Sequence, residues 1–481
     1  MATTIGGVVE PRSASAPGVR ELKLRTAVRA AVAMAALVAA SSAVLPTSAS
    51  AASRPGSVRS IVASPGASVG QIKVSWKASG SHTDKFRIET ALTPFGSSND
   101  GRDAHTFTVS GSKRSTTLSA KKVAQAGAAP ATGNHLYIRV VAIDVTRSGA
   151  RKGKASDLVA TTARALPAAL VGSPLRIASY NIRSAKYDGE DRRNWSVRAA
   201  GVAADILKVQ PGIVAIQEAT PARVNGGMRQ TESLQAALIK ADPAMARYTI
   251  TRTTIYNPNG TPHGSQAARL VYDSSRYQLL SACTDTTLVG GITREWSDTC
   301  SFDLPIQPGD AATWKRSAAY AEFLDLATGK PFLVVSAHLD YRHSKNKATE
   351  AKLNDLRRLQ AATIWANMNM IRKVGEPVVV AGDFNASQND KGGNGPHDYL
   401  VSQGFYDTVG AVQQVNLEFA SLNHFDRTLK ADPEGYGRIV DQILVYGAVG
   451  SNRFQQVVKQ TDPARNSDHN MVYADIALPT I

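Results

Sequence analysis

The chain has 481 residues, of which 43% are hydrophobic and 20% charged, a composition typical of a globular protein with two or three domains. Its two cysteines, Cys283 and Cys300, are too few for a disulfide-stabilised scaffold. The net charge is +16, and residues 53–165 supply most of it with 17 basic and 6 acidic side chains. This segment is predicted to attract a polyanion such as nucleic acid, teichoic acid or anionic lipid, with general solubility as the alternative.

Residues 1–51 have the pattern of a signal peptide. Basic residues between Arg20 and Arg29 precede an apolar stretch over 30–45, and Ala49-Ser50-Ala51 offers small residues to a peptidase. A membrane anchor is the alternative, but the stretch is Ala-rich and shorter than the ~20 strongly apolar residues that a span needs. We therefore expect a secreted monomer with no membrane span after cleavage. An oxidising compartment favours a Cys283–Cys300 disulfide, with two buried thiols as the alternative.

Residues 55–163 are predicted to form an all-β module. Polar and apolar residues alternate in short segments separated by turns, as in an antiparallel sandwich. Trp76, and Tyr137-Ile138-Arg139-Val140 before Ser148-Gly149, are similar to fibronectin type III modules, which implies an immunoglobulin-like sandwich that binds or spaces. Residues 164–174 are expected to be a linker. The alternating segments are 71–76, 85–89, 105–109 and 135–142.

From Leu175 onward, strand patterns alternate with helix patterns, which predicts an α/β domain with mixed sheets over 175–481. Helices are predicted over 196–209, 231–239 and 349–371. The last is amphipathic, and its apolar side is predicted to hold Leu353, Leu356, Leu359, Ile364, Met368 and Ile371. Strands are predicted at 176–180, 213–216, 267–272, 318–326, 332–336, 378–381, 439–446 and 471–476.

Polar side chains stand where several of these apolar strands stop or begin. Strands buried on both faces read as apolar runs, so polar groups at their ends are expected to converge at one sheet edge. Carboxylate and amide oxygens suit a hard divalent cation, whereas the lack of cysteine ligands and of an H-E-x-x-H helix argues against zinc. The pattern predicts a site for a cation and a phosphate ester. Its residues are Asn181, Glu218, His338, Asp383, Asn385, Asp468 and His469.

Six motifs over 175–478 resemble, in the same order, the endonuclease/exonuclease/phosphatase superfamily of deoxyribonuclease-I-like enzymes. The resemblance implies a two-sheet α/β sandwich that hydrolyses phosphate esters by in-line attack of water. The motifs are Tyr180-Asn181-Ile182, Gln217-Glu218, Ser336-Ala337-His338-Leu339, Gly382-Asp383-Phe384-Asn385, 439–445 and Ser467-Asp468-His469.

The resemblance also implies a metal site. Glu218 is expected to be the principal ligand, assisted by Asn181 and Asp468. The expected cation is Mg²⁺, with Mn²⁺ or Ca²⁺ as alternatives. Asn181 taken alone could instead cap a turn.

The remaining residues receive catalytic roles from the same resemblance. Asp383 would orient or deprotonate the attacking water, and Asp441 would pair with His469 so that an imidazolium stabilises developing charge. The substrate phosphate would be bound by three residues, of which His338 could also be a core histidine and Arg316 a partner in a surface salt bridge. These three are Arg316, His338 and Asn385.

The expected substrate is DNA or RNA, because the basic segment 53–165 would hold a polyanion near the site. A sphingomyelinase-type phospholipase C and an inositol phosphate phosphatase are alternatives, as is a non-catalytic protein that binds the cell wall or mediates adhesion. Further positive charge beside a nucleic-acid groove could come from Lys345, Lys347, Lys352, Arg357 and Arg358, or these could form a solvated helix face.

Overall fold

In the computed structural model of the protein, a β-rich region over 58–162 is followed by two larger sheets over 173–478. The predicted signal peptide and Cys283 lie outside the described residues, whereas Cys300 is buried and disulfide-bonded. Among the described residues, no helix combines the length and apolar character needed to cross a bilayer. The structure describes 55–78, 82–95, 104–165, 173–191, 193–220, 223–224, 227–251, 267–281, 287–289, 292–294, 300–310, 316–448, 450–462 and 465–479.

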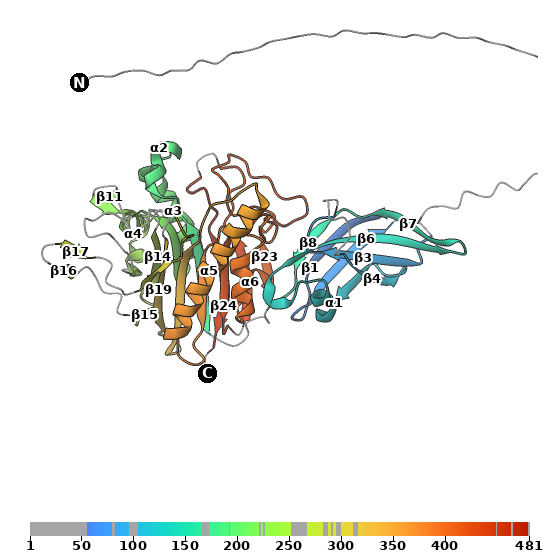
Figure 1. Ribbon diagram of the computed structural model, residues 1–481, viewed down its shortest axis with the longest axis horizontal. Helices are drawn as coiled ribbons and strands as arrows, with labels where there is room; N and C mark the ends of the chain where they lie inside the picture. The colour runs from blue at the N-terminus through green and yellow to red at the C-terminus, as the bar shows by residue number, and fades with distance from the viewer. Residues whose placement is uncertain are drawn as a thin grey trace, which may run out of the picture. The chain divides into compact units, whose positions relative to one another are not determined.

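Residues 58–162 form two antiparallel sheets around one apolar core (Figure 1). Trp76 and Phe86 meet edge to face in that core, with ring centroids 5.2 Å apart. The predicted β-rich region is thus present, while its likeness to fibronectin type III stays a prediction. One sheet holds β1 (Val58–Pro65), β2 (Ile72–Ala78) and β5 (Ser115–Leu118); the other holds β3 (Lys85–Ala91), β4 (His105–Ser110), β6 (His135–Thr146), β7 (Gly149–Ala155) and β8 (Val159–Thr162), and α1 (Ala120–Gln125) follows β5.

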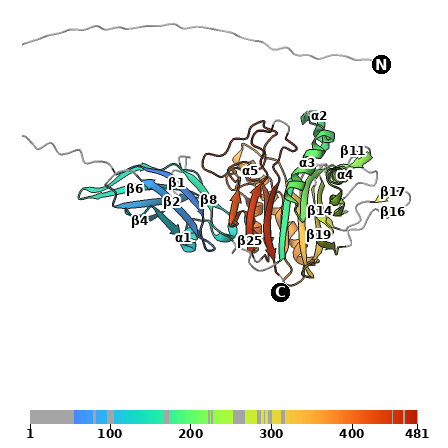
Figure 2. The same ribbon diagram turned by 180° about the vertical axis from the view of Figure 1, so that it is seen from behind.

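Beyond Ser173, two mixed sheets lie face to face, and the described residues place seven strands in each (Figure 2). Side chains from both sheets, such as Ile177 and Val379, form the core between them. The predicted mixed sheets are therefore confirmed. The first sheet has the order β13 (Tyr248–Ile250), β14 (Ala267–Asp273), β10 (Ile213–Ala219), β9 (Ser173–Asn181), β26 (Val472–Leu478), β25 (Gly450–Gln456) and β23 (Gln413–Val415).

The second sheet is built around a parallel pair, β20 (Lys330–His338) and β21 (Val378–Asp383). Its order is β15 (Tyr277–Leu279), β19 (Arg316–Asp325), β20 (Lys330–His338), β21 (Val378–Asp383), β24 (Asp441–Tyr446) and β22 (Tyr406–Asp407), with β18 (Ser301–Leu304) on β19. Two short hairpins lie apart from both sheets: β11 (Arg223–Val224) with β12 (Met228–Arg229), and β16 (Thr287–Val289) with β17 (Ile292–Arg294).

Helices cover the outer face of each sheet, which explains why the central strands are apolar on both sides. On the first sheet, Ile206 of α3 packs with Val214. On the second sheet, Ile364 of α5 packs with Val380. The helices are α2 (Asp188–Asp191), α3 (Trp195–Val209), α4 (Gln230–Ala241), α5 (Lys347–Ile371) and α6 (Gly395–Ser402).

The buried face of α5 differs from the prediction at two positions. Leu359 is 42% exposed and Ile371 is 45% exposed. Leu359 lies about 120° around the helix from Leu353, at about 100° per residue, and Ile371 is the last helical residue. The buried face is completed instead by Arg357 and Gln360, which bond to backbone carbonyls beneath the helix.

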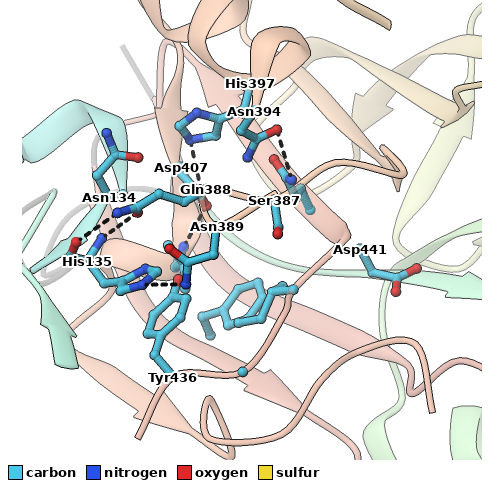
Figure 3. A pocket seen from close by; sticks show the side chains of 16 residues that line it. Asn134, His135, Ser387, Gln388, Asn389, Asn394, His397, Asp407, Tyr436 and Asp441 are labelled. Atoms are coloured by element: carbon cyan, nitrogen blue, oxygen red, sulfur yellow. Dashed lines mark hydrogen bonds and ion pairs between the residues drawn. The ribbon is translucent and has the colours of Figure 1, made fainter. Parts of the chain in front are cut away.

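His397 at the start of α6 holds a buried charge (Figure 3). Its Nδ1 lies 2.9 Å from Asp398 and its Nε2 lies 3.2 Å from Asp407. Burial alone would lower the pKa of His397, but these two carboxylates outweigh it and raise the pKa to about 9.

We expect this ion pair to make stability depend on pH. The folded pKa lies above the unfolded value of about 6.5, so the contribution is complete below pH 6.5 and is lost as the pH rises towards 9. In urea titrations, the free energy of unfolding of the wild type should fall over this window. His397→Gln should make that fall smaller, whereas His105→Gln, at an exposed position of β4, should retain it in full. Equal pH slopes for wild type and His397→Gln would contradict the assignment.

Candidate active site

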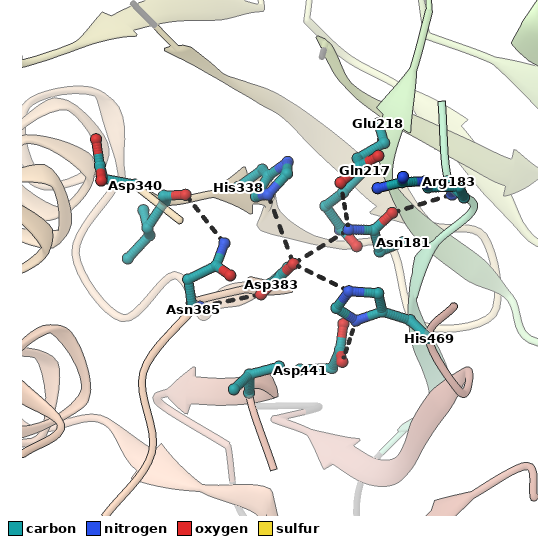
Figure 4. A network of polar contacts seen from close by, with 12 residues as sticks. Asn181, Arg183, Gln217, Glu218, His338, Asp340, Asp383, Asn385, Asp441 and His469 are labelled. Atoms are coloured by element: carbon teal, nitrogen blue, oxygen red, sulfur yellow. Dashed lines mark hydrogen bonds and ion pairs between the residues drawn. The ribbon is translucent and has the colours of Figure 1, made fainter. Parts of the chain in front are cut away.

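The predicted polar residues converge at one edge of the two sheets (Figure 4). Asn181 and His338 are the last residues of β9 and β20, and Asp383 is the last residue of β21. Glu218 lies one residue before the end of β10, and Asp441 begins the antiparallel strand β24. The parallel pairs β9–β10 and β20–β21 therefore deliver their carboxyl ends to the same place.

One amide links the two sheets. The side-chain Nδ2 of Asn181 donates to Glu218 Oε1 and to Asp383 Oδ2, each at 3.1 Å. The second oxygen of each carboxylate accepts a backbone N–H: Glu218 from Ser184 and Asp383 from Asn385, both at 3.0 Å. All four carboxylate oxygens are thus satisfied in a buried environment, which fixes both side chains.

His469 lies between two carboxylates. Its Nδ1 is 2.8 Å from Asp441 Oδ2, and its Nε2 is 3.6 Å from Asp383 Oδ2. Burial would lower the pKa of His469, but the charges of Asp441 and Asp383 raise it well above 6.5. The imidazole is therefore held as a cation with both nitrogens directed at carboxylates.

The pKa of Asp383 is also raised, but here burial is the main cause. Burial raises its pKa to about 6; His469 and Asn181 oppose that rise, and Asp441 adds to it. A carboxylate with a pKa near neutrality can accept a proton from water more readily than an exposed aspartate.

His338 is buried, and its Nε2 lies 3.5 Å from Asp383 Oδ2. Burial, followed by the charges of Arg316 and His469, lowers the pKa of His338 well below 6.5. The ring is therefore neutral and has one N–H to donate. A neutral imidazole can bind a phosphate oxygen without adding a further buried charge.

Three residues around the site have a left-handed backbone. Arg183, Glu218 and Asn385 have φ values of +53°, +61° and +49°. At Glu218 this coincides with a register shift between Ile216 and Ala219 in the pairing of β10 with β14. Such a bulge re-aims a side chain near a strand end, and non-glycine residues with positive φ concentrate at functional sites.

Other predicted residues lie around this centre. Asp468 Oδ2 is 3.4 Å from the Arg183 guanidinium, at the side of the cluster. The Asn385 amide donates to the Leu339 carbonyl at 3.2 Å. Arg316 is buried, and its guanidinium carbon lies 5.4 Å from the centroid of the Tyr341 ring. Burial lowers the pKa of Arg316, while the charges of Glu218, Asp340 and Asp383 oppose that shift, so its guanidinium lies near these carboxylates. Its role in binding phosphate stays a prediction.

One suggested source of surface charge is wrong. Arg357 is fully buried and its Nη2 donates to Glu350 at 2.8 Å, so it cannot line a nucleic-acid groove. Arg358 is paired with Asp355 at 2.7 Å. Both side chains fell within a charge-rich stretch of α5, where sequence alone does not distinguish an inward from an outward arginine.

Sequence reasoning missed Arg183. Its backbone N–H donates to Asn181 Oδ1 at 3.0 Å, and its guanidinium lies 4.5 Å from the centroid of the Tyr187 ring as well as near Asp468. The sequence does contain a signal for it, because Arg183 is a basic residue only two positions after Asn181 at the end of β9. Arg183 orients the Asn181 amide and places positive charge at the rim of the site.

The donor set fits a divalent cation on the Glu218 side. Asp383, Asp441 and His469 bring ligand atoms within 4.8 Å of one another, but both ring nitrogens of His469 are already directed at carboxylates. Glu218 and Asp383 are both buried and both bonded to the Asn181 amide. Two neighbouring buried carboxylates repel each other, and oxygen-bound Mg²⁺ or a similar cation relieves that repulsion.

Residues 178–469 match the family described as the Endonuclease/Exonuclease/phosphatase family. The match covers more than half of the chain and spans the site from Asn181 to His469. The chain belongs to this family. Its members are phosphoester hydrolases that depend on a divalent metal, and the cluster described above occupies the matched region.

Solved structures of the family resemble the chain at low identity. A family member from Bacteroides vulgatus is 24% identical with a TM-score of 0.46, over 64% of this chain and 100% of that one. A mannosyl-6-phosphatase from Bacteroides thetaiotaomicron is 19% identical (TM-score 0.43; 63% and 100%). TDP2 from D. rerio, complexed with a single-stranded DNA product, is 16% identical (TM-score 0.39; 63% and 99%). No protein among those with a curated description matches the chain.

Replacing Glu218 with Gln should weaken metal binding. The change keeps the shape of the side chain but removes the charge that the cation would offset, so affinity for Mg²⁺ or Mn²⁺ should fall by about tenfold or more. The measurement is the rise in melting temperature with added metal. Glu322→Gln, at a surface pair with Lys373, is the matched control and should respond as the wild type does. An unchanged metal response in Glu218→Gln would place the cation elsewhere.

Proposed function

We propose that the protein is a secreted, divalent-metal-dependent phosphodiesterase that cleaves DNA or RNA. The observation that carries this proposal is a buried chain of side-chain contacts beside Glu218. It runs from Asn181 to Asp383, then to His469 and Asp441. It combines a carboxylate with a raised pKa, an imidazolium and an acidic cation site in one place. Hydrolysis of a phosphate ester requires that water be activated and that negative charge be neutralised, and these three groups can do both.

In the proposed reaction, Asp383 orients the attacking water and accepts its proton. The His469 imidazolium, held by Asp441, stabilises negative charge that develops on the phosphate. Arg316, His338 and Asn385 bind the phosphate oxygens. A divalent cation at Glu218, with Asn181 and Asp468 beside it, would neutralise the phosphate and stabilise the leaving oxygen.

The choice of nucleic acid rests on charge. Residues 53–165 carry 17 basic and 6 acidic side chains, and a polyanion would be attracted to them. We propose that residues 1–51 are a signal peptide, that 55–163 are a fibronectin type III-like module, and that 164–174 link it to a catalytic domain over 175–481. The same basic residues could also contact a polyanionic cell-wall polymer.

A substrate panel tests the proposal. Purified protein with Mg²⁺ should cleave plasmid DNA or RNA and should leave sphingomyelin and inositol phosphates intact. Glu218→Gln, prepared in parallel, shows whether any activity comes from a contaminant. Robust lipid cleavage without nucleic-acid cleavage would replace the nuclease assignment with a phospholipase.

Asp383→Asn should abolish turnover while the fold is retained. The amide keeps the volume of the carboxylate but cannot accept a proton from water, so kcat should fall by about 10³-fold or more. Rates measured on the preferred substrate, together with circular dichroism of the variant, check this. Normal turnover in a folded variant would remove Asp383 from the reaction.

A further inference from the structure

We propose that the N-terminal β-region is a positioning element of the active site, and that His135 is its central residue. The contacts of Leu92 and residues 133–165 with residues 384–394, 407–410 and 432–440 are called the seam below. Through the seam, the β-region would fix the segment that carries Asn385 and the segment that leads into Asp441. The effect on turnover rests on the proposed function, whereas the mechanical part does not.

The first contact holds the loop that follows Asp383. The backbone N–H of His135 donates to Gln388 Oε1 at 2.9 Å, and Gln388 Nε2 donates to the carbonyls of His135 and Leu92, each at 3.0 Å. The side chain of Gln388 thus bonds to two strand ends of the β-region as a neighbouring strand would. Gln388 is three residues after Asn385, so the hydrogen bonds of Gln388 restrict the position of Asn385 directly.

The second contact holds the loop before Asp441. The His135 ring stacks on Tyr436, with centroids 3.8 Å apart and planes 21° apart, and meets Tyr137 edge to face at 4.9 Å. Asn389 donates to the Tyr137 hydroxyl. His135, Tyr137 and Tyr436 are all buried, which makes the seam a packed interface of residues from both sides (Figure 3).

The two loops are also tied to each other. Arg438 donates to both oxygens of Asp390, at 2.7 and 2.8 Å. The backbone N–H of Phe384 donates to the Val440 carbonyl at 2.9 Å. A displacement of either loop would therefore be transmitted to the other, and through it to the residues on each side of Asp383.

The rest of the seam leaves little free space. Ala160 N–H donates to the Glu434 carbonyl, and Ala165 N–H donates to the Gly410 carbonyl at 2.7 Å. Gly133 has a φ of +58°, and a Cβ there would lie 2.6 Å from Asp407. A cavity whose lining includes Gly133, His135 and Tyr436 has a volume of only about 30 Å³.

The chemistry of His135 argues against direct substrate binding. Burial lowers its pKa to about 3, so the ring is neutral and cannot attract a phosphate as a cation. Its backbone and one face are occupied by the contacts above. What remains is a geometric role, exerted on Asn385 and Asp441 through the loops.

The test is His135→Ala in the full chain, with His135→Phe as the conservative variant that keeps an aromatic ring on Tyr436. His105→Ala, on the exposed face of β4, is the matched control. Each variant is assayed on bis(p-nitrophenyl) phosphate, which is too small to bridge to the β-region, and on DNA. We expect kcat of His135→Ala to fall about 10- to 100-fold on both substrates with little change in KM, and His135→Phe to recover most of it.

Two other results would overturn the inference. A higher KM for DNA alone would make the β-region a substrate-binding module, and an unchanged kcat in folded His135→Ala would make the seam irrelevant to catalysis. If His135→Ala does not fold, Gln388→Ala removes the first contact without opening the core of the β-region. Absence of hydrolysis by the wild type would reject the proposed function instead.

Hydrogen exchange examines the seam independently of activity. In His135→Ala, or in Gln388→Ala if needed, amides of 384–394 and 432–441 should exchange about tenfold faster than in the wild type. The strands β13 and β14, at the opposite end of the first sheet from β23, should be unaffected. Unchanged exchange in both loops would show that the β-region does not hold them, and would overturn the inference whatever the substrate is.

Discussion

Two buried carboxylates from different sheets share the side-chain amide of Asn181, and this contact constrains the rest of the molecule. Glu218 belongs to the first sheet and Asp383 to the second, so their approach requires the two sheets to be stacked with their strand ends level. The apolar core between the sheets and the helices on their outer faces provide that alignment. The packing of the two sheets therefore determines how closely Glu218 and Asp383 approach each other.

The order of elements and most of the site were predictable, because each apolar run ends at a polar residue. Asn181, Glu218, His338 and Asp383 were identified in this way, and the structure brings them together. The left-handed backbone of Glu218 was not predictable, since the bulge arises from pairing with β14 rather than from a local turn sequence. Strand β25 was missed because its polar sequence lacks an alternating pattern.

The seam was beyond sequence reasoning for a different reason. Gln388 and His135 are 253 residues apart, and the sequence around each residue gives no sign of a partner. The charge of residues 53–165 suggested a surface for polyanions, but it does not predict which uncharged side chains of the β-region contact the loops beside the site. Tertiary contact alone shows that polar and aromatic side chains, rather than basic ones, connect the β-region to the loops beside the site.

The protonation states at the site depend on one another. Asp383 remains able to ionise in a buried position partly because His469 is a cation, and His469 is a cation because Asp441 and Asp383 are anionic. Such groups titrate as a set rather than one by one. A cation beside Glu218 would add positive charge to the same set and favour the ionised form of Asp383. In the proposed reaction, metal binding and ionisation of Asp383 would therefore be coupled by electrostatics, because the amide of Asn181 contacts both carboxylates.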